Sequence, residues 1–122
     1  MTVKGALNAT QKPKSKLSDT CNIGLRSMVE KLIYNTQVII FSKSYCPYCV
    51  TAKNIFDGLD QPYTVLELDQ RADGEDIQKI MGTITGGTSV PRVFVNGVFI
   101  GGGDDVKRLY ESGELEEMLG CE

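Results

Sequence analysis

The chain has no histidine and only four cysteines among its 122 residues. Two of the cysteines, Cys46 and Cys49, have the CxxC spacing that supplies half of a structural zinc site. The other half would need further histidine or cysteine ligands, and only Cys21 and Cys121 remain, single and near opposite ends of the chain. A structural zinc site is therefore disfavoured, and we expect no bound metal.

Long apolar runs are also absent. The longest uninterrupted aliphatic or aromatic run is four residues, at positions 38–41, whereas a membrane-spanning helix needs about 20 apolar residues. We therefore expect no membrane role. The N-terminus lacks the apolar segment of a secretory signal, so we expect a reducing compartment. The cytoplasm is the first choice, with the mitochondrion as the alternative because residues 1–19 have the charge sign of an organelle-targeting peptide.

Positive charge is sparse beyond the N-terminal segment. Residues 1–19 carry four lysines and one aspartate, and the remaining residues carry nine basic and fifteen acidic side chains, so their net charge is −6 against −3 for the whole chain. Proteins hold nucleic acid mainly by neutralising phosphates, so we expect no nucleic-acid partner. Residues 1–19 are polar and interrupted by Pro13, which predicts a disordered arm. Residues 20–122 suit one domain.

Helix and strand patterns alternate after residue 20. Apolar residues at helical spacing predict helices over residues 20–35, 47–59, 73–85 and 103–112, with a short last turn or helix at 114–119. Continuous or alternating apolar patterns predict strands over residues 37–42, 63–68, 92–95 and 98–100. Asn96-Gly97 marks a hairpin between the last two strands, and the helix between the first two strands implies that they run parallel. This order predicts an α/β fold with a four-stranded mixed sheet flanked by helices on both faces.

The CxxC segment, Cys46-Pro47-Tyr48-Cys49, directly follows an apolar strand and begins a predicted helix. Free N–H groups and the helix dipole stabilise a thiolate at a helix N-terminus, and Cys46 lies at that end. Cys49 lies one turn inside, where we expect it to be more covered, and Pro47 suits the first helical turn. A merely structural disulfide is a weak alternative, because a four-residue loop removes little chain entropy. The segment therefore predicts a thiol–disulfide redox site.

Three separated segments, residues 43–49, 88–91 and 101–105, together resemble the dithiol glutaredoxins, over about residues 22–119. The resemblance implies a thioredoxin-like three-layer fold and a glutathione-dependent thiol–disulfide oxidoreductase. Such an enzyme reduces protein–glutathione mixed disulfides and protein disulfides. Cys46 would be the nucleophile and Cys49 the resolving thiol. Glutathione would be the co-substrate, with glutathionylated or disulfide-bonded proteins as partners and no tightly bound cofactor, and we expect a monomer.

The resemblance also implies which residues bind glutathione. Lys43 and Gln78 would face its glycine carboxylate, and Tyr48 would line the groove. Gln78 lies off the apolar stripe of its helix and Tyr48 could equally pack, so a solvated or packed role is the alternative for each. Val90 precedes Pro91, which the resemblance would make a cis proline beside the reactive cysteine, and the backbone of Val90 could pair with the tripeptide as an added strand would.

The glycine segment before the predicted helix at 103 resembles the family's γ-glutamyl site. Helix-initiating N–H groups can hold a carboxylate, so Gly102, Gly103 and Asp104 would bind this end of glutathione, with Asp104 accepting from the ammonium. The alternative for Asp104 is a helix cap. Gly103 is a departure from the family pattern, in which a larger residue is usual.

Two other functions stay open at this point. A thioredoxin reduced by a flavoprotein is disfavoured because the chain has no tryptophan. A [2Fe-2S] cluster held between two chains by Cys46 and glutathione thiolates is disfavoured by Pro47, since the resemblance implies that a small residue at this position helps cluster binding. Cys21 and Cys121 are idle thiols, an auxiliary disulfide or an intermolecular bridge, and their spacing does not choose between these.

Overall fold

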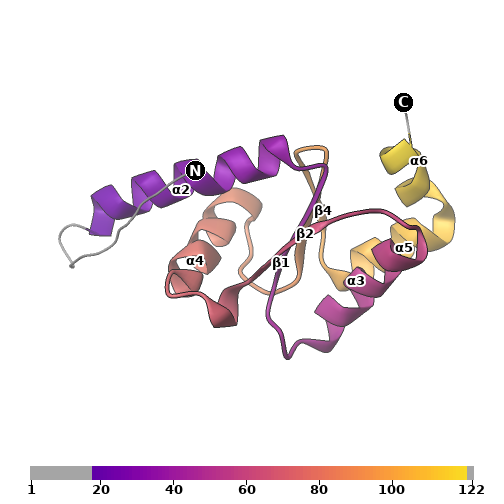
Figure 1. The fold of residues 1–122 in the computed structure, drawn as a ribbon, viewed down its shortest axis with the longest axis horizontal. Helices are drawn as coiled ribbons and strands as arrows, with labels where there is room; N and C mark the ends of the chain where they lie inside the picture. Colours follow the sequence, from indigo (N-terminus) through magenta and orange to yellow (C-terminus); the bar gives the residue numbers. More distant parts are fainter. Residues whose placement is uncertain (1–17, 121–122) are drawn as a thin grey trace.

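The computed structural model describes residues 18–120 (Figure 1). Its helices and strands follow the order predicted from the sequence. The strands are β1 (Val38–Ser42), β2 (Thr64–Glu67), β3 (Arg92–Val95) and β4 (Val98–Gly101). The helices are α2 (Ser18–Asn35), α3 (Pro47–Gly58), α4 (Gly74–Thr85), α5 (Gly103–Ser112) and α6 (Glu114–Gly120), and a 3-10 turn, η2 (Leu68–Gln70), follows β2.

The arm predicted to be disordered, residues 1–19, lies outside the described residues apart from Ser18 and Asp19, which begin α2. Cys121 and the side chain of Cys21 lie outside them as well. Among the helices described, none combines the length and hydrophobicity that a membrane crossing requires.

The sheet has the strand order β2-β1-β3-β4. Strand β1 runs parallel to β2 and antiparallel to β3, and β3 pairs antiparallel with β4. Asn96 and Gly97 form the β3–β4 turn with positive φ angles of 52° and 84°, as a two-residue hairpin turn requires. The mixed sheet, the parallel first pair and the hairpin are therefore confirmed.

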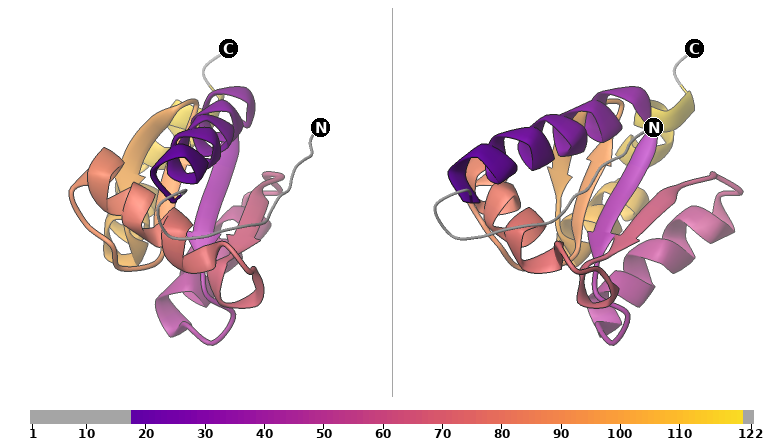
Figure 2. Two further views of the ribbon diagram at one scale, coloured as in Figure 1. Left: turned by 90° about the vertical axis from the view of Figure 1, so that its left-hand side faces the viewer. Right: turned by 60° about the vertical axis from the view of Figure 1, so that its left-hand side comes forward.

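Helices cover both faces of the sheet because alternate side chains of a strand point to opposite faces. All five residues of β1 are buried. Ile39 and Phe41 pack with α2 and α4, whereas Val38 and Ile40 pack with α3, α5 and α6. Figures 1 and 2 show these two helix layers on either side of the strands. Truncating a large core side chain such as Phe41 to alanine lowers the free energy of unfolding by about 3 to 5 kcal/mol. Buried side chains of this kind hold β1 in place, and β1 in turn positions the loop and the helix that follow it.

The topology brings the three sequence motifs to one edge of the sheet. Strands β1 and β4 end at this edge and β3 begins there, because β3 is antiparallel to both neighbours. The CxxC segment follows β1, the Val90-Pro91 segment precedes β3, and the glycine segment follows β4. The CxxC segment, whose Cys46 lies 44 residues before Val90 in the sequence, is therefore brought to the same edge of the sheet as the other two segments.

Candidate active site

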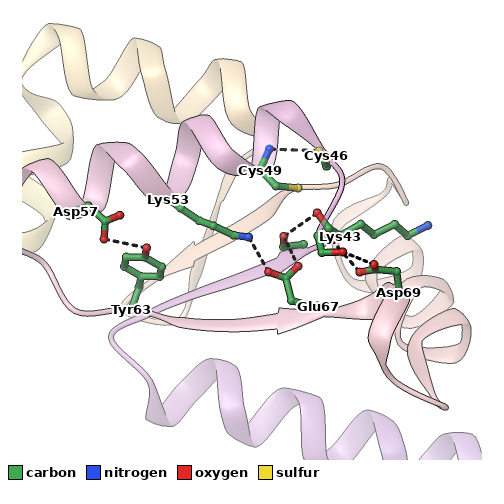
Figure 3. Close-up of polar contacts among 10 residues, drawn as sticks. Lys43, Cys46, Cys49, Lys53, Asp57, Tyr63, Glu67 and Asp69 are labelled. Carbon is green, nitrogen blue, oxygen red and sulfur yellow. Dashed lines mark hydrogen bonds and ion pairs between the residues drawn. The ribbon is translucent and has the colours of Figure 1, made fainter.

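Cys46 is the N-cap residue of α3 and has extended backbone angles. Its sulfur accepts a hydrogen bond from the backbone N–H of Cys49 at 3.2 Å and lies 3.7 Å from the carbonyl oxygen of Val90. Only 9% of Cys46 is exposed, and Figure 3 shows this residue where the loop before α3 turns into the helix. The position combines a helix N-terminus with a route to solvent, as a reactive thiolate requires.

Cys49 lies one turn into α3 and is completely buried. Burial, together with the hydrogen bond to Cys46, raises the pKa of the Cys49 thiol from 9.0 to about 11. Both cysteines are free thiols, and at neutral pH Cys49 therefore carries a proton. The structure confirms that Cys49 is the more covered of the two sulfurs.

The loop between β1 and α3 is held by a carboxylate on the neighbouring strand connection. The backbone N–H of Ser44 donates to Asp69 at 2.9 Å, and the Ser44 hydroxyl donates to the other carboxylate oxygen. These two hydrogen bonds lower the pKa of Asp69 below its ordinary value. The backbone N–H of Cys46 also donates to the Lys43 carbonyl at 3.1 Å. Asp69 was not predicted from the sequence as a site residue. It follows β2, which is parallel to β1, and residues at the carboxyl ends of parallel strands often belong to functional sites, so its position in the sequence could have indicated it.

A polar hollow of about 340 Å³ opens beside this loop. Lys43, Asp69, Arg71 and Gln78 are among the residues that line it. The structure therefore brings Lys43 and Gln78 together, and it adds Arg71, which the sequence did not single out and which pairs with Asp73 at 2.8 Å. The amide of Gln78 donates to the Thr88 carbonyl at 2.7 Å, so this side chain also connects α4 to the loop before β3.

The loop before β3 lies against the reactive cysteine. The Val90–Pro91 peptide bond is cis, as the resemblance implied, and the Val90 carbonyl faces the Cys46 sulfur. The guanidinium of Arg92 donates to the carbonyl and to the hydroxyl of Ser89, at 2.9 and 3.0 Å, and stacks over the ring of Phe99.

The start of α5 lies at the same edge of the sheet as the CxxC segment and the loop before β3. The carboxylate of Asp105 accepts from the Gly102 N–H at 3.0 Å and pairs with Arg108, and both contacts lower the pKa of Asp105. Asp105 therefore caps α5, while Asp104 is exposed. A Cβ atom added to the buried Gly103 would lie 3.0 Å from Tyr48 Cβ, so this glycine lets α5 approach the first turn of α3. Tyr48 itself is 58% exposed.

Comparison with known proteins gives one consistent result. A family model described as "Glutaredoxin" matches residues 38–100. Glutaredoxin-C4 of Arabidopsis thaliana is 48% identical over 106 residues, which cover 87% of this chain and 78% of that protein. Mitochondrial glutaredoxin-2 of Bos taurus is 44% identical over 93 residues, covering 76% of this chain and 59% of that protein.

Solved structures agree with the sequence relatives. Oxidized glutaredoxin 2 from Chlamydomonas reinhardtii superposes with a TM-score of 0.77 at 45% identity, covering 80% of this chain and 92% of that one. A buckwheat glutaredoxin–glutathione complex superposes with a TM-score of 0.79 at 36% identity, covering 88% and 94%. The thioredoxin-like fold expected from the resemblance is therefore confirmed.

Proposed function

This chain belongs to the glutaredoxin family, and from that premise we propose that Cys46 and Cys49 are its catalytic pair. The family supports a glutathione-dependent thiol–disulfide oxidoreductase, and this chain is one. The relatives do not favour the cluster-binding or the thioredoxin-type alternative. The observation that carries the assignment of the pair is the asymmetry of the two sulfurs: Cys46 caps a helix at the protein edge, whereas Cys49 is buried behind it.

In the proposed reaction the Cys46 thiolate attacks the glutathione sulfur of a protein–glutathione mixed disulfide. The S–S bond of the substrate breaks, the protein thiolate leaves, and a new disulfide joins Cys46 to glutathione. A second glutathione thiolate then attacks this disulfide, forms oxidised glutathione and regenerates Cys46. In the dithiol route Cys49 attacks instead, releases glutathione and forms the Cys46–Cys49 disulfide.

We propose that glutathione occupies the edge formed by the three motifs. Lys43 and Gln78, with Arg71 nearby, offer donors for the glycine carboxylate from the polar hollow. The Val90 backbone beside Cys46 would pair with the tripeptide. The N–H groups of Gly103 and Asp104 at the start of α5 would hold the γ-glutamyl carboxylate. The glutathione complex of the similar buckwheat protein supports this proposal.

Asp104 and Tyr48 would flank the same ligand. Asp105 takes the capping role at α5, which leaves the exposed carboxylate of Asp104 available for the ligand ammonium. Tyr48 and Gly102 would contact the ligand from the starts of α3 and α5. Glutathionylated and disulfide-bonded proteins remain the proposed substrates of a monomeric enzyme. The cytoplasm remains the proposed compartment, with the mitochondrion as the alternative that similarity to mitochondrial glutaredoxin-2 favours.

The test is a glutathione-coupled reduction assay on a small glutathione mixed disulfide. We expect turnover with glutathione and a reductase that regenerates it. Turnover with a flavoprotein thioredoxin reductase but none with glutathione would overturn the proposal. The absorbance spectrum of anaerobically purified protein is the companion measurement, because a visible cluster band in an inactive protein would favour cluster binding instead.

A further inference from the structure

The loop between α4 and β3 is held by side chains of the two elements that it connects. Residues 86–91 of this loop lie outside helices and strands. The Gln78 amide of α4 donates to the Thr88 carbonyl at 2.7 Å. Arg92, the first residue of β3, donates through Nε to the next carbonyl, that of Ser89, at 2.9 Å. Two successive carbonyls are therefore paired directly before the residue that lies against the reactive cysteine.

The Arg92 guanidinium is fixed by more than this one bond. Its Nη2 atom donates to the Ser89 hydroxyl at 3.0 Å, and its central carbon lies 5.2 Å from the centre of the Phe99 ring. A side chain at Gly87 would collide with the guanidinium, so the loop backbone also packs closely against it. Because the donors of a guanidinium share one rigid plane, these contacts fix the direction in which the Ser89 carbonyl points.

The direction of the Ser89 carbonyl decides where the Val90 N–H points. Both groups belong to one peptide unit, which is planar and, at this bond, trans. In a trans unit the C=O and the N–H point in opposite directions. The hydrogen bond from Arg92 to the Ser89 carbonyl therefore holds the Val90 N–H in a direction away from the guanidinium.

Arg92 approaches the loop from the face of the sheet that α2 and α4 cover. It lies opposite Phe41 in the register of β1 and β3, opposite residues share a face, and Phe41 packs with these two helices. Helix α3, which follows Cys46, covers the other face. An N–H that points away from Arg92 is therefore directed toward the side on which Cys46 lies. Within residues 18–120 no group accepts a hydrogen bond from the Val90 N–H, so a ligand can use it.

We propose that Arg92 is a positioning residue for glutathione, because by holding the Ser89 carbonyl it aims the Val90 N–H at a backbone carbonyl of the tripeptide. Arg92 itself does not touch the ligand. The inference rests on the proposed function, in which the Val90 backbone pairs with glutathione as an added strand would. It adds to that function the side chain that directs the donor before the ligand arrives.

Directing the donor in advance matters because this loop would otherwise be ordered only on binding. It begins with Gly86 and Gly87, and glycine has the greatest backbone freedom to lose. A site that is already ordered avoids that cost. Loss of one hydrogen bond to a ligand lowers affinity about three- to tenfold, and we expect an effect of this size. The reactivity of Cys46 should not change, since its sulfur keeps the hydrogen bond from the Cys49 N–H.

A purely packing role over Phe99 is the competing interpretation, because a guanidinium on an aromatic face stabilises a protein by itself. The two interpretations differ in which substrates they affect. A packing role would change the reaction of Cys46 with every disulfide alike. A positioning role changes only the reaction with a disulfide that offers a peptide carbonyl to the Val90 N–H.

The experiment compares two mixed disulfides of one coloured aromatic thiol, the first with glutathione and the second with 2-mercaptoethanol, which has no peptide group. With both, the Cys46 thiolate attacks the aliphatic sulfur, the S–S bond breaks and the aromatic thiolate leaves, so stopped-flow absorbance follows the same exchange. Arg92→Met keeps an unbranched stem beside Phe99 and loses the donors. In this variant of the full, reduced chain we expect the second-order rate constant for the glutathione disulfide to fall about three- to tenfold. The rate constant for the mercaptoethanol disulfide should change by less than about twofold.

The matched control is Arg26→Met, because Arg26 pairs with Glu30 on α2. It should leave both rate constants unchanged. An equal fall with the two disulfides in Arg92→Met, or no fall with the glutathione disulfide, would overturn the positioning role. A wild type that reacts no faster with the glutathione disulfide than with the mercaptoethanol disulfide would instead reject the glutathione site of the proposed function.

The amide signal of Val90 reports the pairing directly. S-methylglutathione has the tripeptide backbone and cannot exchange disulfides, so it serves as the probe in an NMR titration. The Val90 amide proton should move downfield in the wild type and should move less at saturation in Arg92→Met. Equal shifts in the two proteins would show that the N–H is aimed without Arg92 and would overturn the inference. A wild type in which this signal does not move would reject the proposed backbone pairing itself.

Two further variants separate the hydrogen bonds from the ring contact. Ser89→Ala removes only the hydroxyl that Arg92 Nη2 contacts, so it should lower the rate constant for the glutathione disulfide by less than about threefold. In the Arg92→Met background it should add nothing, because the two residues act together. Phe99→Leu removes the ring and leaves both donors, so the preference for the glutathione disulfide should persist. A loss of preference as large as that of Arg92→Met would indicate packing alone.

Arg92→Lys provides the test if Arg92→Met fails to fold. It keeps the charge and the long stem but lacks the planar fork of donors. The preference for the glutathione disulfide should therefore fall in the same direction as in Arg92→Met. A preference equal to that of the wild type would show that the two hydrogen bonds to Ser89 do not direct the Val90 N–H.

Discussion

The two sides of the CxxC segment differ in what surrounds each sulfur. The neighbours of the Cys46 sulfur are backbone groups of Cys49 and Val90, and a polar hollow lined by Lys43 opens beside the loop that precedes Cys46. Behind Cys49 the neighbours are side chains of the protein interior, and no solvent reaches the sulfur. Two chemically identical side chains, three residues apart, therefore have different surroundings because they lie one helical turn apart.

The largest expected effect separates the two sulfurs directly. Cys46→Ser should lower both deglutathionylation and protein-disulfide reduction by at least about a thousandfold, because the nucleophile is lost. Cys49→Ser should retain deglutathionylation and lose protein-disulfide reduction. Steady-state assays on a glutathionylated and on a disulfide-bonded substrate measure the two activities. Equal loss of both in Cys49→Ser would contradict the assigned roles.

The burial of Cys49 should appear as a pH-dependent stability of the reduced protein. The pKa of Cys49 rises from 9.0 to about 11 on folding, so the unfolded chain loses this proton first as pH increases. The buried neutral thiol of Cys49 therefore stabilises the folded protein fully below pH 9, and this stabilisation is lost as the pH rises from 9 to 11. It amounts to about 2 to 3 kcal/mol in the free energy of unfolding.

Urea unfolding of the reduced protein across this range measures the loss. Cys49→Ser is the control, because it keeps the other titrating groups and lacks the buried thiol. Identical pH dependence in the two proteins would show that Cys49 is not held in its neutral form.

Substitution in the polar hollow lined by Lys43 and Gln78 should change the binding of glutathione. Gln78→Ala removes a donor from the hollow and its hydrogen bond to the Thr88 carbonyl. We expect the KM for glutathione to rise about three- to tenfold with little change in kcat, in line with the loss of one hydrogen bond. Gln61→Ala is the matched control, since Gln61 follows α3 and its side-chain contacts, to Gln37 and Pro62, lie elsewhere. An unchanged KM would exclude Gln78 from the glutathione site.

The smallest effect concerns the loop that carries Cys46. Asp69→Asn weakens the two hydrogen bonds from Ser44, and we expect kcat/KM to fall by less than about threefold at neutral pH, because the carboxylate is solvent-exposed and its bonds are screened. Asp60→Asn, at the far end of α3, is the control. No change beyond that of the control would show that the loop holds its place without Asp69.

Acid should act on the same loop. The Ser44 hydrogen bonds lower the pKa of Asp69 below 3.8, so their contribution is complete above that pH and is lost as pH falls through the folded-state pKa. The free energy of unfolding of the wild type should therefore fall more steeply below pH 4 than that of Asp69→Asn. Urea unfolding at acid pH measures the difference.

Much of the fold followed from local patterns. The helix and strand order, the parallel first pair and the Asn96-Gly97 hairpin were predicted because apolar periodicity and turn chemistry are properties of neighbouring residues. The more covered position of Cys49 was predicted for the same reason, as helix phase follows from the three-residue spacing. Asp105 rather than Asp104 caps α5, and a one-residue difference of this kind depends on the angle at which the chain leaves β4.

The sequence by itself determined the layered α/β fold and the unequal burial of the two sulfurs of the CxxC segment. Only the tertiary structure decided what each sulfur touches. Ser42 meets Glu67, and Ser44 meets Asp69, across 25 residues of chain, because the register of two parallel strands places these side chains together. Register is set by the packing of the whole sheet against its helices, and therefore no local pattern in the sequence reports it.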